Sequence, residues 1–439
     1  MQGNHHERAR PPIDPARIER RRLKRRRLRR QRTAAGLGTL AAAAILGLTV
    51  SGLDLTLPSR AAVVGHVQAG AAPRAKGVRT FDIVASGDLL IHGPVWERAA
   101  VLGHGRYDFR PLLARVKPIV SRAALAICHV ETPMGAGAPS GYPVFNSPKE
   151  LAAAVAWTGW DVCSTASNHS VDKGQYGIET TLGALDAAGV HHTGSFRTPA
   201  EAWRITILTV RGLRVALLSY TYGTNGVALP HPWSVNLIST SKVVADARRA
   251  RRRGADFVIA NMHWGDEYVH EPNVQERDLA RYLLRRRIVD LIVGQHVHVV
   301  QPIEQIARRF VVFGEGNLLS NQTAECCPAE SQDGLIAIVH VRATSDRATV
   351  TGVDYVPTYV EHPTFVVQPV AARLQELTRE GQGESALAQA LRTSYRRTVA
   401  YAGRSTRIRP LGSLGGGMEG RSQAASPVRV NQPERWRGR

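Results

Sequence analysis

Cysteine is scarce in this sequence: four residues in a chain of 439 are too few for a fold that depends on a disulfide framework. Cys128 and Cys163 lie in apolar runs of strand character, where we expect them to be buried thiols. Cys326 and Cys327 are neighbours in a loop-like segment, and a bond between adjacent cysteines would be strained. The cysteines therefore do not identify the compartment in which the protein works.

Acidic residues are also few beside basic ones, 36 Asp and Glu against 57 Lys and Arg, which gives a formal net charge of +21. The excess lies at the two ends, because residues 1–33 carry a net charge of +10 and residues 403–439 carry one of +6. The middle of the chain keeps a net charge of only +5 and holds no nucleic-acid-binding motif. Composition therefore argues against nucleic acid as a partner.

The apolar run at residues 34–53 lies at the short end of the ~17 to 25 residues that a membrane span needs, and because it is rich in Ala and Gly its hydrophobicity is marginal for a span. The basic segment 1–33 predicts, by the positive-inside rule, a cytoplasmic amino end and an exported remainder. Two outcomes stay open: an uncleaved single-pass anchor in the cell membrane, or secretion after a signal cut near Ala69 to Ala72. The anchor is favoured because that cut would lie far from the apolar run.

Composition divides the rest of the chain into four parts. Residues 54–79 have the character of a linker, and residues 80–360 alternate strand-like and helix-like segments, which predicts one α/β domain. Residues 361–402 show weak helical periodicity and are expected to form a helical extension. Residues 403–439 are a basic tail rich in Gly and Ser that we expect to be disordered.

Two histidine-bearing loops follow apolar, strand-like runs in the second half of the chain. His263 follows residues 257–260, and the pair His296 and His298 follows residues 290–293, with a helical pattern between the two loops. Both loops lie at the carboxyl ends of strands that we expect to be parallel, which is where open α/β sheets bind ligands. Two residues apart on an extended segment, His296 and His298 would point the same way. Because neutral imidazole is a common ligand of transition metals, we expect a metal site here.

Other predicted strands also end in polar residues, which enlarges the candidate site. Carboxylate, amide oxygen and imidazole make a mixed set without the cysteines that structural zinc sites prefer, and such a set can hold two divalent ions, Mn, Fe or Zn. The expected metal ligands are Asp88, Glu131, Asn168, His263, His296 and His298.

His169, beside one of these ligands, is the expected catalytic acid that protonates a leaving oxygen. Ordinary structural roles remain open for several of the ligands: Asp88 and Asn168 as turn residues and Glu131 as a helix cap. Residues expected to support the ligands or to contact substrate are His92, Asp172, Asp266, Glu267 and Asn317.

Six motifs follow one another along the predicted domain: G-D-L-L at Gly87, H-V-E-T-P at His129, S-N-H-S-V-D-K-G at Ser167, H-W-G-D-E-Y at His263, D-L-I-V-G-Q-H-V-H at Asp290 and G-N-L-L-S-N-Q at Gly316. With them, residues 81 to about 322 resemble the capsule-synthesis, poly-γ-glutamate biosynthesis family of the CapA type, a branch of the calcineurin-like metallophosphoesterase fold. The resemblance implies a four-layer α/β sandwich, and it implies the metal-ligand and acid roles named above.

The motifs depart from the usual family pattern at three places. The family usually has Asn at the position of His129, G-H-H-P-H where this chain has G-Q-H-V-H from Gly294, and S-L-G-N-F where this chain has G-E-G-N-L from Gly314. The H-x-H pair is kept, and a carboxylate, Glu315, is added beside the expected site. These differences bear on substrate more than on metal binding.

The resemblance implies a membrane-anchored, extracytoplasmic protein of capsule or poly-γ-glutamate biosynthesis or export. Its implied partners are an anionic polymer such as poly-γ-glutamate or other capsule or cell-wall material, and a membrane synthase complex. Three classes stay open: a two-metal hydrolase or transferase acting on an amide or phosphoester, a non-catalytic polymer-binding or transport component, and a general metallophosphoesterase. Whether the protein is an enzyme is not decided by the sequence.

Overall fold

The computed structural model describes residues 77–344 and 347–412. The predicted basic segment 1–33, the apolar run 34–53 and nearly all of the linker 54–79 lie outside this part of the chain. In the residues that are described, no helix is both long enough and apolar enough to cross a bilayer. Of the tail predicted at 403–439, residues 403–412 are described, and Ile408–Pro410 form a short strand, β15.

The larger of two sheets is built around β1 (Arg79–Leu89), which pairs in parallel with β2 on one side and antiparallel with β12 on the other. The sheet has nine strands, in the order β14-β13-β12-β1-β2-β3-β4, with β11 added beside β1 and β15 beside β13. The other strands are β2 (Leu125–Val130), β3 (Val162–Ser164), β4 (His191–Thr193), β11 (Asn317–Leu319), β12 (Asp333–Ala343), β13 (Ala348–Glu361) and β14 (Val366–Pro369).

The second sheet has six strands in the order β5-β6-β7-β8-β10-β9. Its middle strands β6, β7, β8 and β10 are parallel, and β5 and β6 form a hairpin that turns at Arg211 and Gly212. The strands are β5 (Thr206–Val210), β6 (Leu213–Thr221), β7 (Phe257–His263), β8 (Leu291–Gln295), β9 (Ile303–Ile306) and β10 (Arg309–Val312).

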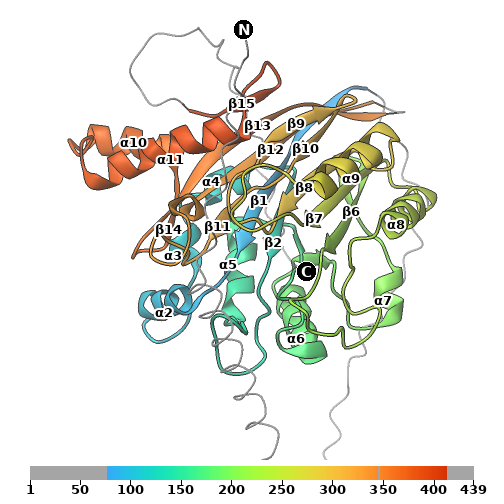
Figure 1. Cartoon of the computed structure of the whole chain (residues 1–439), viewed down its shortest axis with the longest axis horizontal. Helices are drawn as coiled ribbons and strands as arrows, with labels where there is room; N and C mark the ends of the chain where they lie inside the picture. The colour runs from blue at the N-terminus through green and yellow to red at the C-terminus, as the bar shows by residue number, and fades with distance from the viewer. Residues whose placement is uncertain (1–76, 345–346, 413–439) are drawn as a thin grey trace, which may run out of the picture. The chain divides into compact units, whose positions relative to one another are not determined.

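Helices cover the outer faces of both sheets, so the domain has four layers (Figure 1). One buried cluster lies between the nine-stranded sheet and the helices from α2 to α6, a second between the two sheets, and a third between the six-stranded sheet and α8 and α9. The predicted α/β class is confirmed. The helices are α2 (Gly93–Leu102), α3 (Arg110–Leu113), α4 (Lys117–Val120), α5 (Glu150–Thr158), α6 (Gly174–Ala187), α7 (Pro199–Trp203), α8 (Thr240–Arg252), α9 (Val274–Arg285), α10 (Val370–Arg379) and α11 (Ala386–Ala402), with a 3-10 turn at Ala329–Gln332.

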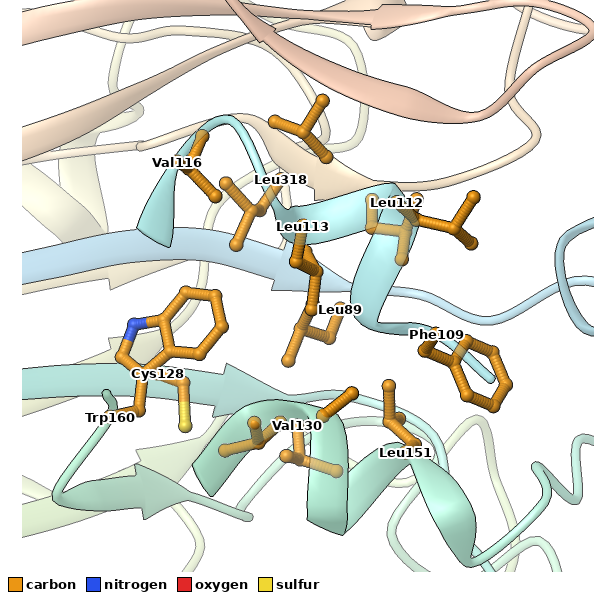
Figure 2. Packing of buried hydrophobic residues seen from close by; sticks show 14 of the residues in the cluster. Leu89, Phe109, Leu112, Leu113, Val116, Cys128, Val130, Leu151, Trp160 and Leu318 are labelled. Carbon is orange, nitrogen blue, oxygen red and sulfur yellow. The ribbon is translucent and has the colours of Figure 1, made fainter. Parts of the chain in front are cut away.

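The end of β1 is held in place by the helix-side core. Leu89 is fully buried in that core, and Figure 2 shows it between Leu113 on one side and Val130 on the other. A register irregularity between Ala85 and Asp88 interrupts the pairing of β1 with β2 just before this point. Because neighbouring side chains of a strand point to opposite faces, anchoring Leu89 in the core directs Asp88 away from the helices.

The cysteine prediction is half right. Cys128 and Cys163 are buried as expected, but they are joined by a disulfide between the paired strands β2 and β3, where the two residues lie directly opposite each other. The structure also pairs Cys326 with Cys327. The sequence could not show the first pairing, because the cysteines are 35 positions apart and the strand register that brings them together is not visible in the sequence.

Candidate metal centre

The six expected ligands come together at one edge, where the carboxyl ends of parallel strands from both sheets meet. Two groups of ligand atoms each lie within 4.8 Å of one another: Asp88, Glu131 and His298 in one, and Glu131, His263 and His296 in the other. Asn168 joins the second group, since its Oδ1 lies 2.9 Å from Nε2 of His263. All six side chains are buried, with at most 3 % of their surface exposed.

Glu131 occupies the shared position between the two groups. It lies just after β2, and its Oε1 is 3.8 Å from Nε2 of His298. Both of its carboxylate oxygens are buried without a hydrogen-bond partner in the described structure. Burial, together with the charge of Asp88, raises the pKa of Glu131 well above its usual range, against the attraction of His298. A buried carboxylate with no donor at either oxygen is costly unless a cation is bound there.

His298 is oriented through its Nδ1 atom. That nitrogen lies 3.2 Å from Oδ2 of Asp88 and 3.1 Å from Oδ1 of Asn317, which leaves Nε2 facing Glu131. Asn317 is itself fixed, because its Nδ2 donates to Gln322 and to the carbonyl of Ser331. Burial alone would lower the pKa of His298, but Glu131 and Asp88 raise it to about 9.

The pKa values of His263 and His296 are shifted in the opposite direction from that of His298. Burial and the neighbouring histidines lower the pKa of each well below its usual value, so both imidazoles are neutral at physiological pH. Their rings lie 4.6 Å apart, and the Nδ1 atom of each is buried without a partner in the described part of the chain. Tyr222 lies over His296 at 4.4 Å between ring centroids and forms a partly exposed wall of the site. Neutral imidazoles with an unshared electron pair are the form that binds metals.

The backbone that carries the histidine pair differs from the expected extended segment. β8 ends at Gln295, and both His296 (φ 97°) and His298 (φ 58°) have left-handed backbone angles. The two imidazoles still reach the same cluster, and the backbone N–H of His296 donates to Asp88. Left-handed angles at residues other than Gly cost free energy and are concentrated at functional sites, which fits this position.

Two glycines allow the segment 313–316, which leads from β10 of one sheet to β11 of the other, to lie closely against the strands at this edge. A Cβ atom on Gly87 would lie 1.9 Å from the carbonyl oxygen of Gly316, and one on Gly294 would lie 1.8 Å from that of Phe313. Any larger residue would push this segment away from the strands next to Asp88 and His296.

His169 directly follows Asn168 in the chain and lies beside the cluster. Its Nδ1 is 2.8 Å from Oδ2 of Asp172, which also accepts the backbone N–H of Phe145. The Phe145 ring packs edge-on against His169. Nε2 is therefore the nitrogen of His169 that can give or take a proton.

The remaining predicted residues are placed differently from one another. His92 is held by the carbonyl of Leu90, and burial lowers its pKa to about 4; it belongs to none of the metal-compatible groups among the described residues. Glu267 is exposed but has an oxygen within reach of His296 and His298. Asp266 is exposed and accepts a hydrogen bond from Asn273 at the start of α9, so the structure does not bring it into the cluster.

Sequence reasoning missed His129. This histidine is fully buried on β2, its Nδ1 lies 2.7 Å from the Ser164 hydroxyl, and its unpartnered Nε2 lies 3.8 Å from Oδ1 of Asp88. With Asp88 and His263 it forms a further group of atoms within metal-binding reach. Burial lowers its pKa to about 4, so it too is neutral. The available signal was its spacing from Glu131, because residues two apart on a strand face the same side.

The donor set fits a divalent metal. Buried atoms without a partner in the described structure include Oδ1 of Asp88, both oxygens of Glu131, Nε2 of His129 and Nδ1 of His263 and His296. Buried polar atoms are normally paired, so a concentration of unpaired acceptors on carboxylates and neutral imidazoles indicates a cation site.

Residues 82–322, a little over half of the chain, match the family described as bacterial capsule synthesis protein PGA_cap. The chain is 29 % identical over 182 residues to the capsule biosynthesis protein CapA of Bacillus anthracis, a match that covers 40 % of this chain and 44 % of that protein. It is 29 % identical over 163 residues to the PGA biosynthesis protein CapA of Bacillus subtilis, covering 37 % and 43 %. A probable polyglutamine synthesis accessory protein of Mycobacterium tuberculosis is 28 % identical over 174 residues, covering 36 % and 45 %. The chain thus spans less than half the length of the curated relatives that it matches.

Solved structures give weaker similarities. The NAD nucleotidase of Haemophilus influenzae superimposes with a TM-score of 0.42 at 12 % identity, covering 73 % of this chain and 67 % of that one. A calcineurin-like phosphoesterase of Bacillus subtilis gives a TM-score of 0.40 at 13 % identity, covering 72 % and 100 %. TM-scores below 0.5 support no argument from either structure.

Proposed function

Because the chain belongs to the bacterial capsule synthesis protein family PGA_cap, we propose that it is a two-metal hydrolase or transferase of capsule or poly-γ-glutamate biosynthesis. The observation that carries the proposal is the convergence of Asp88, Glu131, Asn168, His263, His296 and His298, with the shared carboxylate of Glu131 between two groups of ligand atoms. A purely structural polar core would also have paired the oxygens of Glu131 and Nδ1 of His263 and of His296, which have no partner among the described residues.

The proposed mechanism assigns separate tasks to the residues of the chain. Bound divalent cations would polarise an acyl or phosphoryl oxygen of the substrate and activate water for attack. Asp88, Glu131 and the buried imidazoles would hold the cations. His169, oriented by Asp172, would give a proton from Nε2 to the leaving group. Tyr222, whose pKa is raised to about 12 by burial and by Glu267 and Glu131, keeps its hydroxyl proton and can donate to the substrate.

Turnover by the full-length protein on poly-γ-glutamate and on a phosphodiester tests this function. His263→Ala should lower turnover at least a hundredfold with an unchanged circular dichroism spectrum, since it removes a nitrogen from the buried cluster. His231→Ala, at an exposed histidine outside the cluster, is the matched control and should retain full turnover.

Other results would assign the protein differently. A wild type that is inert on both substrates, or a His263→Ala protein that keeps its turnover, would identify a non-catalytic polymer-binding component. Fast phosphodiester hydrolysis without any action on polyglutamate would identify a general phosphoesterase.

We further propose that residues 34–53 anchor the protein in the cell membrane with the described domain outside, beside the enzymes that synthesise the polymer. The Cys128–Cys163 disulfide supports this location, since structural disulfides persist in oxidising compartments. Protease added to intact cells should digest the domain and leave a tag at the amino end protected. A domain that is protected until the cells are lysed would contradict the location.

A further inference from the structure

A recess of about 840 Å³ opens at the end of the six-stranded sheet opposite the metal centre. Phe257 and Asp290, which line it, lie at the amino ends of β7 and β8, whereas His263 and His296 lie at the carboxyl ends of the same strands. Since each strand residue advances the chain by about 3.3 Å, the recess and the metal centre are about 20 Å apart along β7. The recess is therefore a separate place on the molecule.

Arginines from separate segments line this recess. They come from the end of α9, the β9–β10 turn and the start of β10, the β12–β13 hairpin and the segment before β15: Arg287, Arg308, Arg309, Arg347 and Arg407. Among the described residues, Asp290 is the one acidic member of the lining. Its carboxylate is already used, because it accepts the backbone N–H of Val258 and pairs with Arg251 and, at 3.7 Å, with Arg309. The described residues of the lining thus leave most of the positive charge of the recess without a compensating carboxylate.

A neighbouring recess of about 230 Å³ extends this basic surface. It shares Arg287 with the first and adds Arg248, Arg251 and Arg252 from the last turns of α8. Repulsion among these cations is visible at Arg309: burial and the nearby Arg287, Arg347 and Arg251 lower its pKa, against the attraction of Asp290. A bound anion would relieve that repulsion.

We propose that the two recesses together, called here the arginine recess, bind an extended polycarboxylate chain at a site distinct from the metal centre. Arginine presents a planar, permanently charged fork that binds carboxylates in a bidentate manner. The volume exceeds what a single carboxylate fills, and the arginines are distributed over two hollows that share Arg287, so the occupant carries several anionic groups along its length. The choice of a carboxylate polymer rests on the proposed function, in which the substrate is an anionic polymer.

The lining disfavours the other common polyanions. Elements that bind membrane surfaces insert exposed apolar side chains, and grooves for single-stranded nucleic acid stack bases on aromatic rings. Of the described residues that line either recess, Phe257 is the one aromatic, and it is completely buried, as is nearly all of Val350. Binding by the arginine recess would therefore be electrostatic and bidentate, which suits a flexible chain of carboxylates.

Binding of fluorescent poly-γ-glutamate to the full-length protein, measured by anisotropy in the presence of a chelator, tests the proposal without turnover. Three exposed arginines of the recess are replaced together: Arg287→Ser, Arg308→Ser and Arg347→Ser. The matched control replaces three exposed arginines that line neither recess, Arg106→Ser, Arg122→Ser and Arg396→Ser, and removes the same charge. We expect the recess variant to lose at least tenfold in affinity and the control less than twofold.

Equal losses in the two variants, or no loss in the recess variant, would overturn the proposal. So would tighter recess-dependent binding of anionic phospholipid vesicles or of a single-stranded oligonucleotide than of polyglutamate. His263→Ala separates this proposal from the proposed function: it should bind the polymer as the wild type does, even if the metal centre proves to have no enzymatic role.

Discussion

At the scale of single residues, the site depends on which nitrogen each histidine presents. Asp88 and Asn317 hold Nδ1 of His298, and this leaves Nε2 toward Glu131. Hydrogen bonds of this kind fix the ring orientation of metal-binding histidines and typically change metal affinity by 10- to 100-fold. Asn317, which orients the ligand His298, should therefore affect metal affinity nearly as much as the ligand itself.

Asn317→Ala should lower the affinity for Mn²⁺ about tenfold or more, because His298 loses one of the two acceptors that orient it. Equilibrium dialysis of the full-length protein measures this. Asn321→Ala is the control, since Asn321 offers its backbone N–H to His92 and not its side chain. Equal affinities for Mn²⁺ in the two variants would show that Asn317 does not orient the ligand.

A second prediction at this scale concerns Glu315 and the pH dependence of stability. It is fully buried, and burial raises its pKa to about 8 from 4.5, despite a hydrogen bond from Gln295. Below about pH 4.5 the carboxyl is protonated in both the folded and the unfolded chain. As the pH rises toward 8, the unfolded chain loses the proton first, so the contribution of Glu315 to stability falls through that range.

Glu315→Gln should remove this dependence. Relative to the variant, the wild type should lose on the order of 3 kcal/mol of unfolding free energy between pH 5 and pH 8.5, measured by urea denaturation with a chelator present. Glu97→Gln, at an exposed glutamate, should show no such trend. A difference between wild type and Glu315→Gln that does not change with pH would mean that Glu315 is ionised in the folded protein at neutral pH.

At the scale of elements, the candidate site lies where strand ends of the two sheets come together, beside the segment 313–316 that leads from β10 to β11. That segment lies backbone against backbone on Gly87 and Gly294, where no side chain fits. The metal centre is thus formed jointly by the ends of β1, β2, β7 and β8 and by the loops after them, and no single motif contains it.

Gly294→Ala should lower the unfolding free energy by more than about 2 kcal/mol and weaken metal binding, because its Cβ would overlap the Phe313 carbonyl. Gly183→Ala is the control: it lies within α6, has open space around its Cβ, and should stabilise the protein by about 0.5 to 1 kcal/mol. Thermal unfolding and dialysis measure both effects. A Gly294→Ala protein as stable as the wild type would contradict the close approach.

Much of this element structure can be predicted from the sequence. Where it cannot be predicted, the physical reason can be identified. The strands that carry Asp88, Glu131 and His263 and the helix from Val274 to Arg285 follow from apolar periodicity, which is a local property. His129 was overlooked because its meaning depends on the register that sets it opposite Asp88. The arginine recess likewise depends on how separate turns meet in space, and the left-handed angles at His296 and His298 depend on tertiary contacts.

At the scale of the whole molecule, the candidate metal centre and the proposed polymer site lie at opposite ends of the same parallel strands. The metal centre is made of buried carboxylates and neutral imidazoles, and the arginine recess is a hollow, cationic surface. This separation would let one part of a polymer be held while another part reaches the metals. The arginine recess also offers an explanation, other than nucleic-acid binding, for the modest positive charge of the middle of the chain.

The Cys128–Cys163 disulfide gives a prediction at this scale, because it ties two central strands of the domain together across 35 residues. Replacing both residues by Ala should lower the unfolding free energy by roughly 3 to 4 kcal/mol, from the loop that the bond closes. Urea denaturation measures the loss, and adding a reductant should lower the stability of the wild type but not that of the double variant. Detection of both as free thiols in protein purified from its native location would contradict the bond and the proposed export.

The most direct measurement of the central claim is the number of divalent ions that the full-length protein binds, determined by equilibrium dialysis with Mn²⁺ and elemental analysis. We expect two ions per chain in the wild type and in His231→Ala, and the loss of at least one ion in His263→Ala and in Glu131→Gln, with folding retained. A wild type that binds no ion, or variants that bind as many ions as the wild type, would contradict a metal centre built from these residues.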